Sequence, residues 1–144
     1  MNQDKINEVV GEILRIKDKL GLSLTKWQAP ELLEAMFELA SYKVTLGSIV
    51  AQVELEYNQA YNLRKVESAQ GIRRLVVDLP VSKAEVQVDA ESREVREAEA
   101  QAQYQLTMLK NLYRDTEMMV TVLQSKLRYL TTDRMQDSRT PSVN

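Results

Sequence analysis

A cluster of basic side chains in the middle of the chain is the clearest candidate for chemistry. Between positions 63 and 83 the cations are Arg64, Lys65, Arg73, Arg74 and Lys83. Only two acids, Glu67 and Asp78, lie in the same stretch. Lys and Arg side chains neutralise phosphates and release condensed counterions, which is a main source of affinity for nucleic acid. The segment therefore predicts a nucleic-acid-binding site at these five residues.

The stretch that follows is acidic and supports a second interpretation. Its charged residues between positions 84 and 99 are Glu85, Asp89, Glu91, Glu94, Glu97 and Glu99, against Arg93 and Arg96. If the two stretches lie side by side in antiparallel helices, these acids pair with Arg64 and Lys65 and add little net stability. In the alternative, unpaired cations, especially Arg73 and Arg74, contact phosphates when several chains present them together. The formal charge of the whole chain is -2, so any nucleic-acid binding must be local.

The composition argues against catalysis and against a metal site. The chain has no Cys and no His, so thiolate nucleophiles, Cys/His metal sites and the commonest general base are excluded. Glu85 and Asp89 lie four residues apart on one helical face, but carboxylate metal sites in helical bundles usually include histidine. No glycine-rich phosphate loop, nucleophile elbow or HExxH pattern is present. We expect a non-enzymatic protein without a cofactor.

The elements that must position these charges are helices. Apolar side chains recur at heptad spacing along residues 88–130, which predicts one long helix. Residues 31–74 show the same period, with Leu39, Leu46, Val53 and Ala60 one heptad apart. Gly47 in this helix marks a close approach of another helix. With 44% hydrophobic residues, one Phe, four Gly and three Pro, the chain is typical of an all-α protein.

Two helices of similar length joined by a short break fold back most simply as a long antiparallel hairpin resembling a coiled coil. The stripe from Leu106 to Leu130 is wider than one partner helix can cover, so the sequence also predicts a homo-oligomer. The residues expected in the core or the oligomer interface are Leu46, Val53, Leu106, Leu109, Tyr113, Val120, Leu123 and Leu127.

The hairpin is predicted to span residues 30–136, with a break near 71–82. Ser82 and Glu85 have the S-x-x-E spacing of a capping box, which predicts the start of the second helix. The apolar residues of the break are expected to form a strand-like or irregular tip. Residues 1–29 are predicted to hold an amphipathic helix over 4–20, ended by Gly21 as a left-handed cap, and a connector over 22–29. Residues 137–144 are expected to be disordered.

The chain shows no sign of export or membrane insertion. Acidic residues are mixed into the N-terminal segment, which lacks the basic start and continuous apolar run of a signal peptide. No run of eighteen apolar residues occurs, so no membrane partner is expected. We expect a soluble cytoplasmic protein, located in a bacterial host if the chain is encoded by a phage.

Residues 40–130 resemble, in outline, the bacteriophage recombination mediator proteins of the UvsY type. The residues that carry the resemblance are Leu63, Arg64, Lys65, Gly71 and Arg73, then Val88, Val95, Gln103 and Tyr104. Ala69 and Gln70 stand where that family's pattern has tyrosines. The resemblance implies a ring-like oligomer that binds single-stranded DNA and contacts a RecA-like recombinase and a single-strand-binding protein. The alternative is a phage or bacterial structural or assembly protein, such as a scaffolding protein, that acts only through helix pairing.

Overall fold

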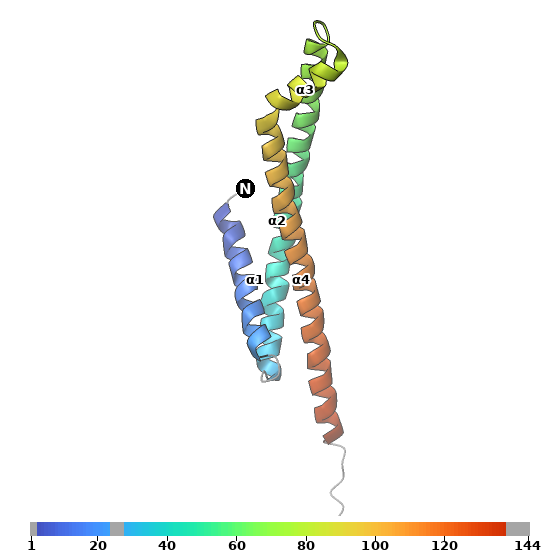
Figure 1. Ribbon diagram of the computed structural model, residues 1–144. Coiled ribbons are helices and arrows are strands. Elements are labelled where there is room, and N and C mark those ends of the chain that lie inside the picture. The colour runs from blue at the N-terminus through green and yellow to red at the C-terminus, as the bar shows by residue number, and fades with distance from the viewer. Residues whose placement is uncertain (1–2, 24–27, 138–144) are drawn as a thin grey trace, which may run out of the picture. The chain divides into compact units, whose positions relative to one another are not determined.

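The computed structural model describes residues 3–23 and 28–137, and they form four α-helices (Figure 1). The helices are α1 (Gln3–Ser23), α2 (Ala29–Leu75), α3 (Val81–Glu91) and α4 (Arg93–Asp137). The described residues contain no strand. The all-α prediction is confirmed, and the helix expected over residues 31–74 is found as α2.

The chain divides into two compact units. The middle unit is Ile49–Lys110, and the terminal unit combines Asn2–Ser48 with Asn111–Asn144. α2 and α4 each contribute one part to both units, whereas α1 belongs to the terminal unit and α3 to the middle unit. Each unit has its own buried side chains.

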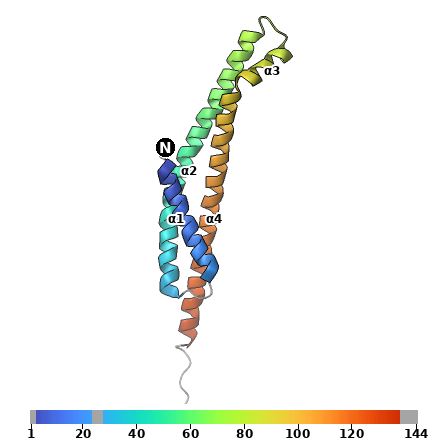
Figure 2. The same cartoon turned by 60° about the vertical axis from the view of Figure 1, so that its left-hand side comes forward.

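The core of the terminal unit is built from three helices. α1 lies beside the first part of α2 (Figures 1 and 2), and it also contacts α4 through an ion pair between Lys17 and Asp115. Its buried face follows the three- and four-residue spacing of a helix and consists of Ile6, Val9, Ile13, Ile16 and Leu20. α2 and α4 add Leu32, Leu39, Leu46 and Leu123. Burial of each such side chain contributes about 1.5–3 kcal/mol, and α1 depends on it because so short a helix is marginal in water.

Two further residues show how closely α2 and α4 approach in the terminal unit. A Cβ atom added at Gly47 would lie 3.3 Å from the Tyr113 ring, so the predicted close approach at Gly47 is confirmed. Thr116 is fully buried, and its hydroxyl donates a hydrogen bond of 2.7 Å to the Leu112 carbonyl one turn earlier. This local bond satisfies the hydroxyl and lets a polar residue occupy a core position.

The middle unit packs the second part of α2 against α3 and the first part of α4. Its buried apolar residues are Ile49, Val53, Ala84, Val88, Leu106 and Leu109. Gly71 of α2 meets Val88 of α3 so closely that an added Cβ would lie 2.7 Å from a Val88 methyl group. A larger residue at this position would force the two helices apart.

The break between α2 and α3 is shorter than predicted, and it is not strand-like. α2 continues through Gly71 to Leu75, and the chain turns over residues 76–80 with a hydrogen bond of 2.9 Å from the Leu79 N–H to the Leu75 carbonyl. The capping box expected from Ser82 and Glu85 is also wrong, because α3 starts at Val81 and no side chain caps it. The Pro80 carbonyl instead accepts the first helical hydrogen bonds, from the N–H groups of residues 83 and 84. Ser82 therefore lies inside the first turn, where it cannot act as the cap.

The single helix expected over residues 88–130 is interrupted at Ser92. This residue ends α3 with φ -91 and ψ 18, and α4 begins at the next position. Its buried hydroxyl donates a hydrogen bond of 2.6 Å to the Val88 carbonyl, which also accepts the Ser92 N–H at 2.9 Å. A serine that bonds back to the carbonyl one turn earlier competes with regular helix geometry and bends the chain.

Corrections also apply at the ends of α1 and α2. α1 continues to Ser23, and no described glycine has a positive φ, so Gly21 is an interior helical residue and not a left-handed cap. At the start of α2, the Gln28 N–H donates a hydrogen bond of 3.0 Å to the Glu31 carboxylate, which caps that helix. The rest of the predicted connector, 24–27, and the predicted tail, 138–144, lie outside the described residues, whereas Asp137 is the last residue of α4.

The contact between Gly71 and Val88 leads to a first prediction. Gly71→Ala should lower the free energy of unfolding by about 1–3 kcal/mol, because the overlap with Val88 exceeds the gain in helix propensity. In a Val88→Ala background the same substitution should instead raise the free energy of unfolding by about 0.5–1 kcal/mol. Urea denaturation of the four proteins measures this coupling.

Gly11→Ala is the matched control for this cycle. No atom lies within 4 Å of the Cβ that it would add, so it should stabilise α1 by about 0.5–1 kcal/mol in either background. A Gly71→Ala protein as stable as Gly11→Ala would show that α2 and α3 do not meet at this glycine.

Candidate nucleic-acid interface

All five predicted cations lie in the middle unit, but their surroundings differ. Arg64, Lys65, Arg73 and Arg74 belong to α2, and Lys83 lies in the first turn of α3. The last two arginines are in the final turn of α2, where the helix dipole favours positive charge. Their position is thus explained by helix stability alone, and a binding role needs further evidence.

Arg64 is held by a carboxylate of α4. Its guanidinium forms an ion pair with Glu99, and the two side chains are only 27% and 14% exposed. A half-buried pair of this kind keeps both charges in place, because separating them would leave one charge poorly solvated. Arg64 is therefore a structural cation and is not available to a phosphate.

Arg74 is also paired, at the edge of a groove. It lies 2.5 Å from the Glu91 carboxylate at the end of α3. The groove has a volume of about 390 Å³, and Gly71, Val88 and Ser92 form part of its wall. Glu67 and Glu91 line it as well, so the groove offers negative charge along with Arg74 and does not favour an anion.

Three of the predicted cations keep their charge exposed. Lys65, Arg73 and Lys83 are exposed, and within the described part of the chain none of them pairs with a carboxylate. The Lys65 ammonium lies 4.5 Å from the centre of the Tyr61 ring, which is a cation–π contact. The structure thus divides the predicted site into two ion-paired arginines and three open cations.

Two tyrosines lie near the open cation Lys65, and the prediction of the site did not include them. The rings of Tyr57 and Tyr61 are 6.2 Å apart and tilted by 34°, and both are half-buried. Tyr57, Tyr61 and Lys65 follow one another at four-residue spacing, so they are neighbours along α2. Arg73 lies eight residues beyond Lys65 and about 80° further round the helix, and these four residues are called the row. The sequence signal was this spacing, which extends from the tyrosines into the basic cluster. The row combines aromatic faces for stacking with cations for phosphates.

The electrostatic field around this row is unfavourable to a polyanion. The middle unit contains eight Lys and Arg residues against ten Asp and Glu residues. Nucleic-acid affinity depends on the number of phosphates neutralised, and a lone chain offers few open cations. Binding through this row therefore requires several copies of the chain.

The predicted core and oligomer residues fall into two groups. Leu46, Val53, Leu106, Leu109 and Leu123 are buried by the chain's own helices. Tyr113, Val120 and Leu127 are half-buried. The first group already packs inside one chain, so a contact between chains must use other side chains.

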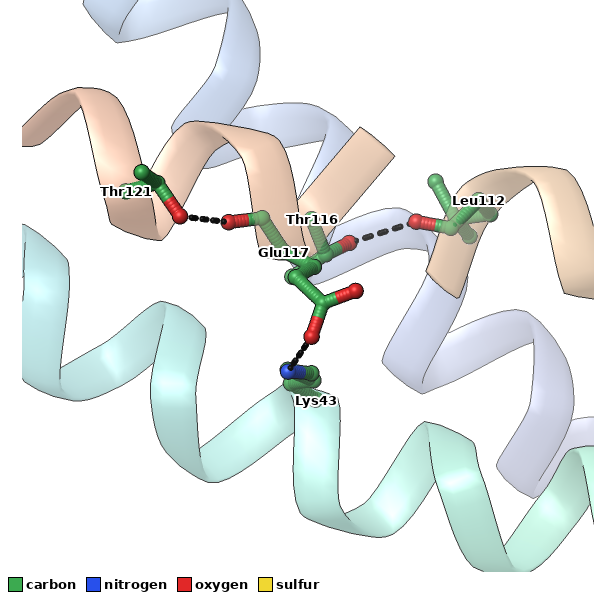
Figure 3. Close-up of polar contacts among 5 residues, drawn as sticks. All are labelled: Lys43, Leu112, Thr116, Glu117 and Thr121. Carbon is green, nitrogen blue, oxygen red and sulfur yellow. Dashed lines mark hydrogen bonds and ion pairs between the residues drawn. The ribbon is translucent and has the colours of Figure 1, made fainter. Parts of the chain in front are cut away.

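A second charged cluster lies in the terminal unit. Figure 3 shows Lys43 of α2 reaching Glu117 of α4, with 2.7 Å between the ammonium nitrogen and the carboxylate oxygen. The ammonium also lies 5.1 Å from the centre of the Tyr113 ring. The hydrogen bond to Glu117 is the main cause of a raised pKa for Lys43, and partial loss of water opposes it. Lys43 is thus protonated at neutral pH and ties two helices together, whereas a nucleophilic lysine needs a lowered pKa.

The described residues contain no group of three or more acidic, Cys or His side chains that could hold a metal ion. None of their helices is both long enough and apolar enough to cross a membrane.

Comparisons with protein-family models, with curated proteins and with solved structures find no match to this chain. The resemblance to mediator proteins of the UvsY type therefore rests on the residues themselves.

The different surroundings of the two paired arginines lead to a second prediction. Glu99→Gln should lower the free energy of unfolding by about 1–3 kcal/mol, because it leaves the half-buried Arg64 without a counter-charge. Glu91→Gln is the matched control and should cost less than about 1 kcal/mol, since its pair with Arg74 is exposed. The melting temperatures of both variants, measured at low and at high salt, distinguish the half-buried ion pair from the exposed one. Equal effects at both positions would mean that Arg64 is as well hydrated as Arg74.

Proposed function

We propose that the protein is a non-enzymatic homo-oligomer that acts through helix pairing, with α2 and α4 forming a long antiparallel hairpin that resembles a coiled coil. The ion pairs of the middle unit support the antiparallel direction. Glu54 pairs with Lys110 and Arg64 pairs with Glu99, so positions that rise along α2 meet positions that fall along α4. Helices of this kind can pair with a helix of another chain through matching apolar faces alone. A structural or assembly protein therefore needs no other chemistry.

Exposed apolar side chains are the observation that carries this proposal. In the middle unit they include Leu55, Leu63, Val66, Val77, Val86, Tyr104 and Met108. In the terminal unit they include Phe37, Val44, Met118, Val122 and Tyr129. Single exposed apolar residues are normal on a protein surface, but sets at helical spacing on long helices are typical of surfaces that pair with another helix.

The corresponding prediction concerns the association state. The purified chain should sediment as an oligomer at micromolar concentration, and its melting temperature should rise with protein concentration, since association stabilises the folded form by mass action. Leu123→Asp should abolish both by unfolding the terminal unit, because Leu123 is buried within the chain. A monomer that remains folded at high micromolar concentration would rule out self-association as the function.

A second candidate function is favoured by the row on α2. We propose that an oligomer presenting Tyr57, Tyr61, Lys65 and Arg73 from several chains binds single-stranded DNA without sequence preference. Stacking on the tyrosines and phosphate contacts by the open cations supply the affinity, and several copies raise the effective concentration of contacts. This activity fits the mediator role that the family resemblance implies, in which a bacteriophage protein in the host cytoplasm helps to load a RecA-like recombinase in the presence of a single-strand-binding protein.

A test of DNA binding follows from the difference between open and paired cations. Lys65→Ala combined with Arg73→Ala should weaken binding to an oligothymidine strand and flatten its salt dependence, because each lost phosphate contact removes a released counterion. Tyr61→Ala should weaken binding by stacking loss without changing the salt slope. Lys19→Ala, which removes an exposed cation of the terminal unit, is the control and should have no effect. Unchanged affinity in the double variant would leave helix pairing as the sole function.

A further inference from the structure

An apolar groove in the terminal unit lies between the end of α1 and α4. It is lined by Leu20, Gly21, Met118, Met119, Val122 and Leu123, and its volume is about 390 Å³. Leu123 is buried and forms part of its base. The ion pair between Lys17 and Asp115, 3.6 Å apart, adds a polar edge. A groove of this size and lining accommodates a large side chain with an apolar body and a polar tip.

The face of α4 beside this groove carries exposed apolar residues at heptad spacing. Met118 is 67% exposed, Val122 51% and Tyr129 67%. Their positions follow the alternating three- and four-residue steps of a coiled-coil seam, with Ser125 between Val122 and Tyr129. This seam differs from the buried stripe through Thr116 and Leu123, which faces the chain's own core. α4 therefore has one seam that is filled within the chain and one that is open.

The charges along this part of α4 are complementary to their own reversed copy. Between positions 114 and 133 they are Arg114, Asp115, Glu117, Lys126, Arg128 and Asp133, and Arg134 follows directly. The pair of acids Asp115 and Glu117 and the pair of bases Lys126 and Arg128 lie on opposite sides of Val122, at similar distances from it along the helix. A second α4 running in the opposite direction thus brings Glu117 level with Lys126 and Asp115 level with Arg128. A second α4 in the same direction brings acids level with acids.

We propose that a second copy of the chain packs its α4 antiparallel against this seam about a two-fold axis near Val122, and that the partner's Tyr129 enters the groove beside Gly21. This proposal rests on the self-association proposed above and assigns the surface that carries it. With the axis near Val122, the partner's Tyr129 is level with Asp115, which lies at one end of the groove.

The in-chain ion pairs of Asp115 and Glu117 leave these two carboxylates exposed. Asp115 and Glu117 are 54% and 57% exposed although they pair with Lys17 and Lys43, so each can also accept a second cation at the rim. Rim charges of this kind add little affinity, but they select orientation by penalising the reversed alignment. The affinity comes from the apolar seam and from the tyrosine, since aromatic side chains that fill pockets dominate interface energies.

The first part of the test compares two tyrosines. Tyr129→Ala should raise the dimer dissociation constant at least tenfold in sedimentation, and Tyr129→Phe should stay within about threefold of the parent, because the ring fills the groove. Tyr104→Ala is the matched control, since Tyr104 is 68% exposed and belongs to the middle unit, and it should leave the dissociation constant unchanged. Circular dichroism checks that all three variants retain their helices. An effect of Tyr104→Ala equal to that of Tyr129→Ala would overturn the assignment of the surface.

The second part of the test uses the absence of cysteine from the chain to determine orientation. Val122→Cys should form a disulfide-linked dimer on mild oxidation, because this position lies at the axis. Thr132→Cys should not, since its two copies would lie about 30 Å apart at about 1.5 Å per residue, and a disulfide needs Cα atoms within about 7 Å. Linkage at both positions would indicate parallel pairing and overturn the proposal. No linkage at either position in a chain that still sediments as an oligomer would overturn it and leave the proposed self-association standing, whereas a monomeric parent chain would overturn both.

Discussion

Burial of heptad-spaced apolar side chains between neighbouring helices is the constraint on which the structure depends. α1 carries Gly11 and Gly21 in its interior and would be marginal alone, yet Ile6, Val9, Ile13, Ile16 and Leu20 on its apolar face are buried. The side chains that cover it come from α2 and α4, so the terminal unit exists only when three segments distant in sequence are brought together. The middle unit depends on the same kind of packing with fewer buried residues, and it uses ion pairs between its helices as well.

The sequence was informative wherever a pattern repeats over many turns. The all-α class and the extent of α2 follow from a heptad period that continues for several repeats, so single exceptions do not obscure it. The interruption at Ser92 could not be found in this way, because the heptad period runs across it without a change of phase. It depends on one hydroxyl that bonds to the Val88 carbonyl, and serine at a helix position usually points to solvent without such an effect. The capping box failed for a related reason, since Pro80 starts α3 before Ser82 can cap it.

In the candidate interface, too, the kind of contact could be predicted from the sequence but the residues that form it could not. The sequence indicated that acids and bases of neighbouring helices would pair, but the identity of the pairs depends on which side of each helix faces its neighbour. Arg64 and the adjacent Lys65 both lie over the Tyr61 ring, but only Arg64 also pairs with a carboxylate, that of Glu99. Folding and ligand binding therefore compete for the same set of cations, and an arginine that strengthens the helix pair is lost to any phosphate. Helix geometry alone decides which of two neighbouring residues serves each purpose.

The two glycines of α2 that face other helices have a consequence for register. A heptad pattern repeats every seven residues, so an apolar stripe alone is satisfied almost as well after one helix slips by a heptad along its neighbour. Tyr113 lies against Gly47, and Val88 lies against Gly71. A slip by seven residues would place Tyr113 against Ala40 or Glu54, and Val88 against Arg64. Each of these residues has a Cβ, which would overlap with Val88 and would crowd the Tyr113 ring. Each unit thus has one glycine whose missing side chain disfavours the shifted alignments that the repeat would otherwise allow.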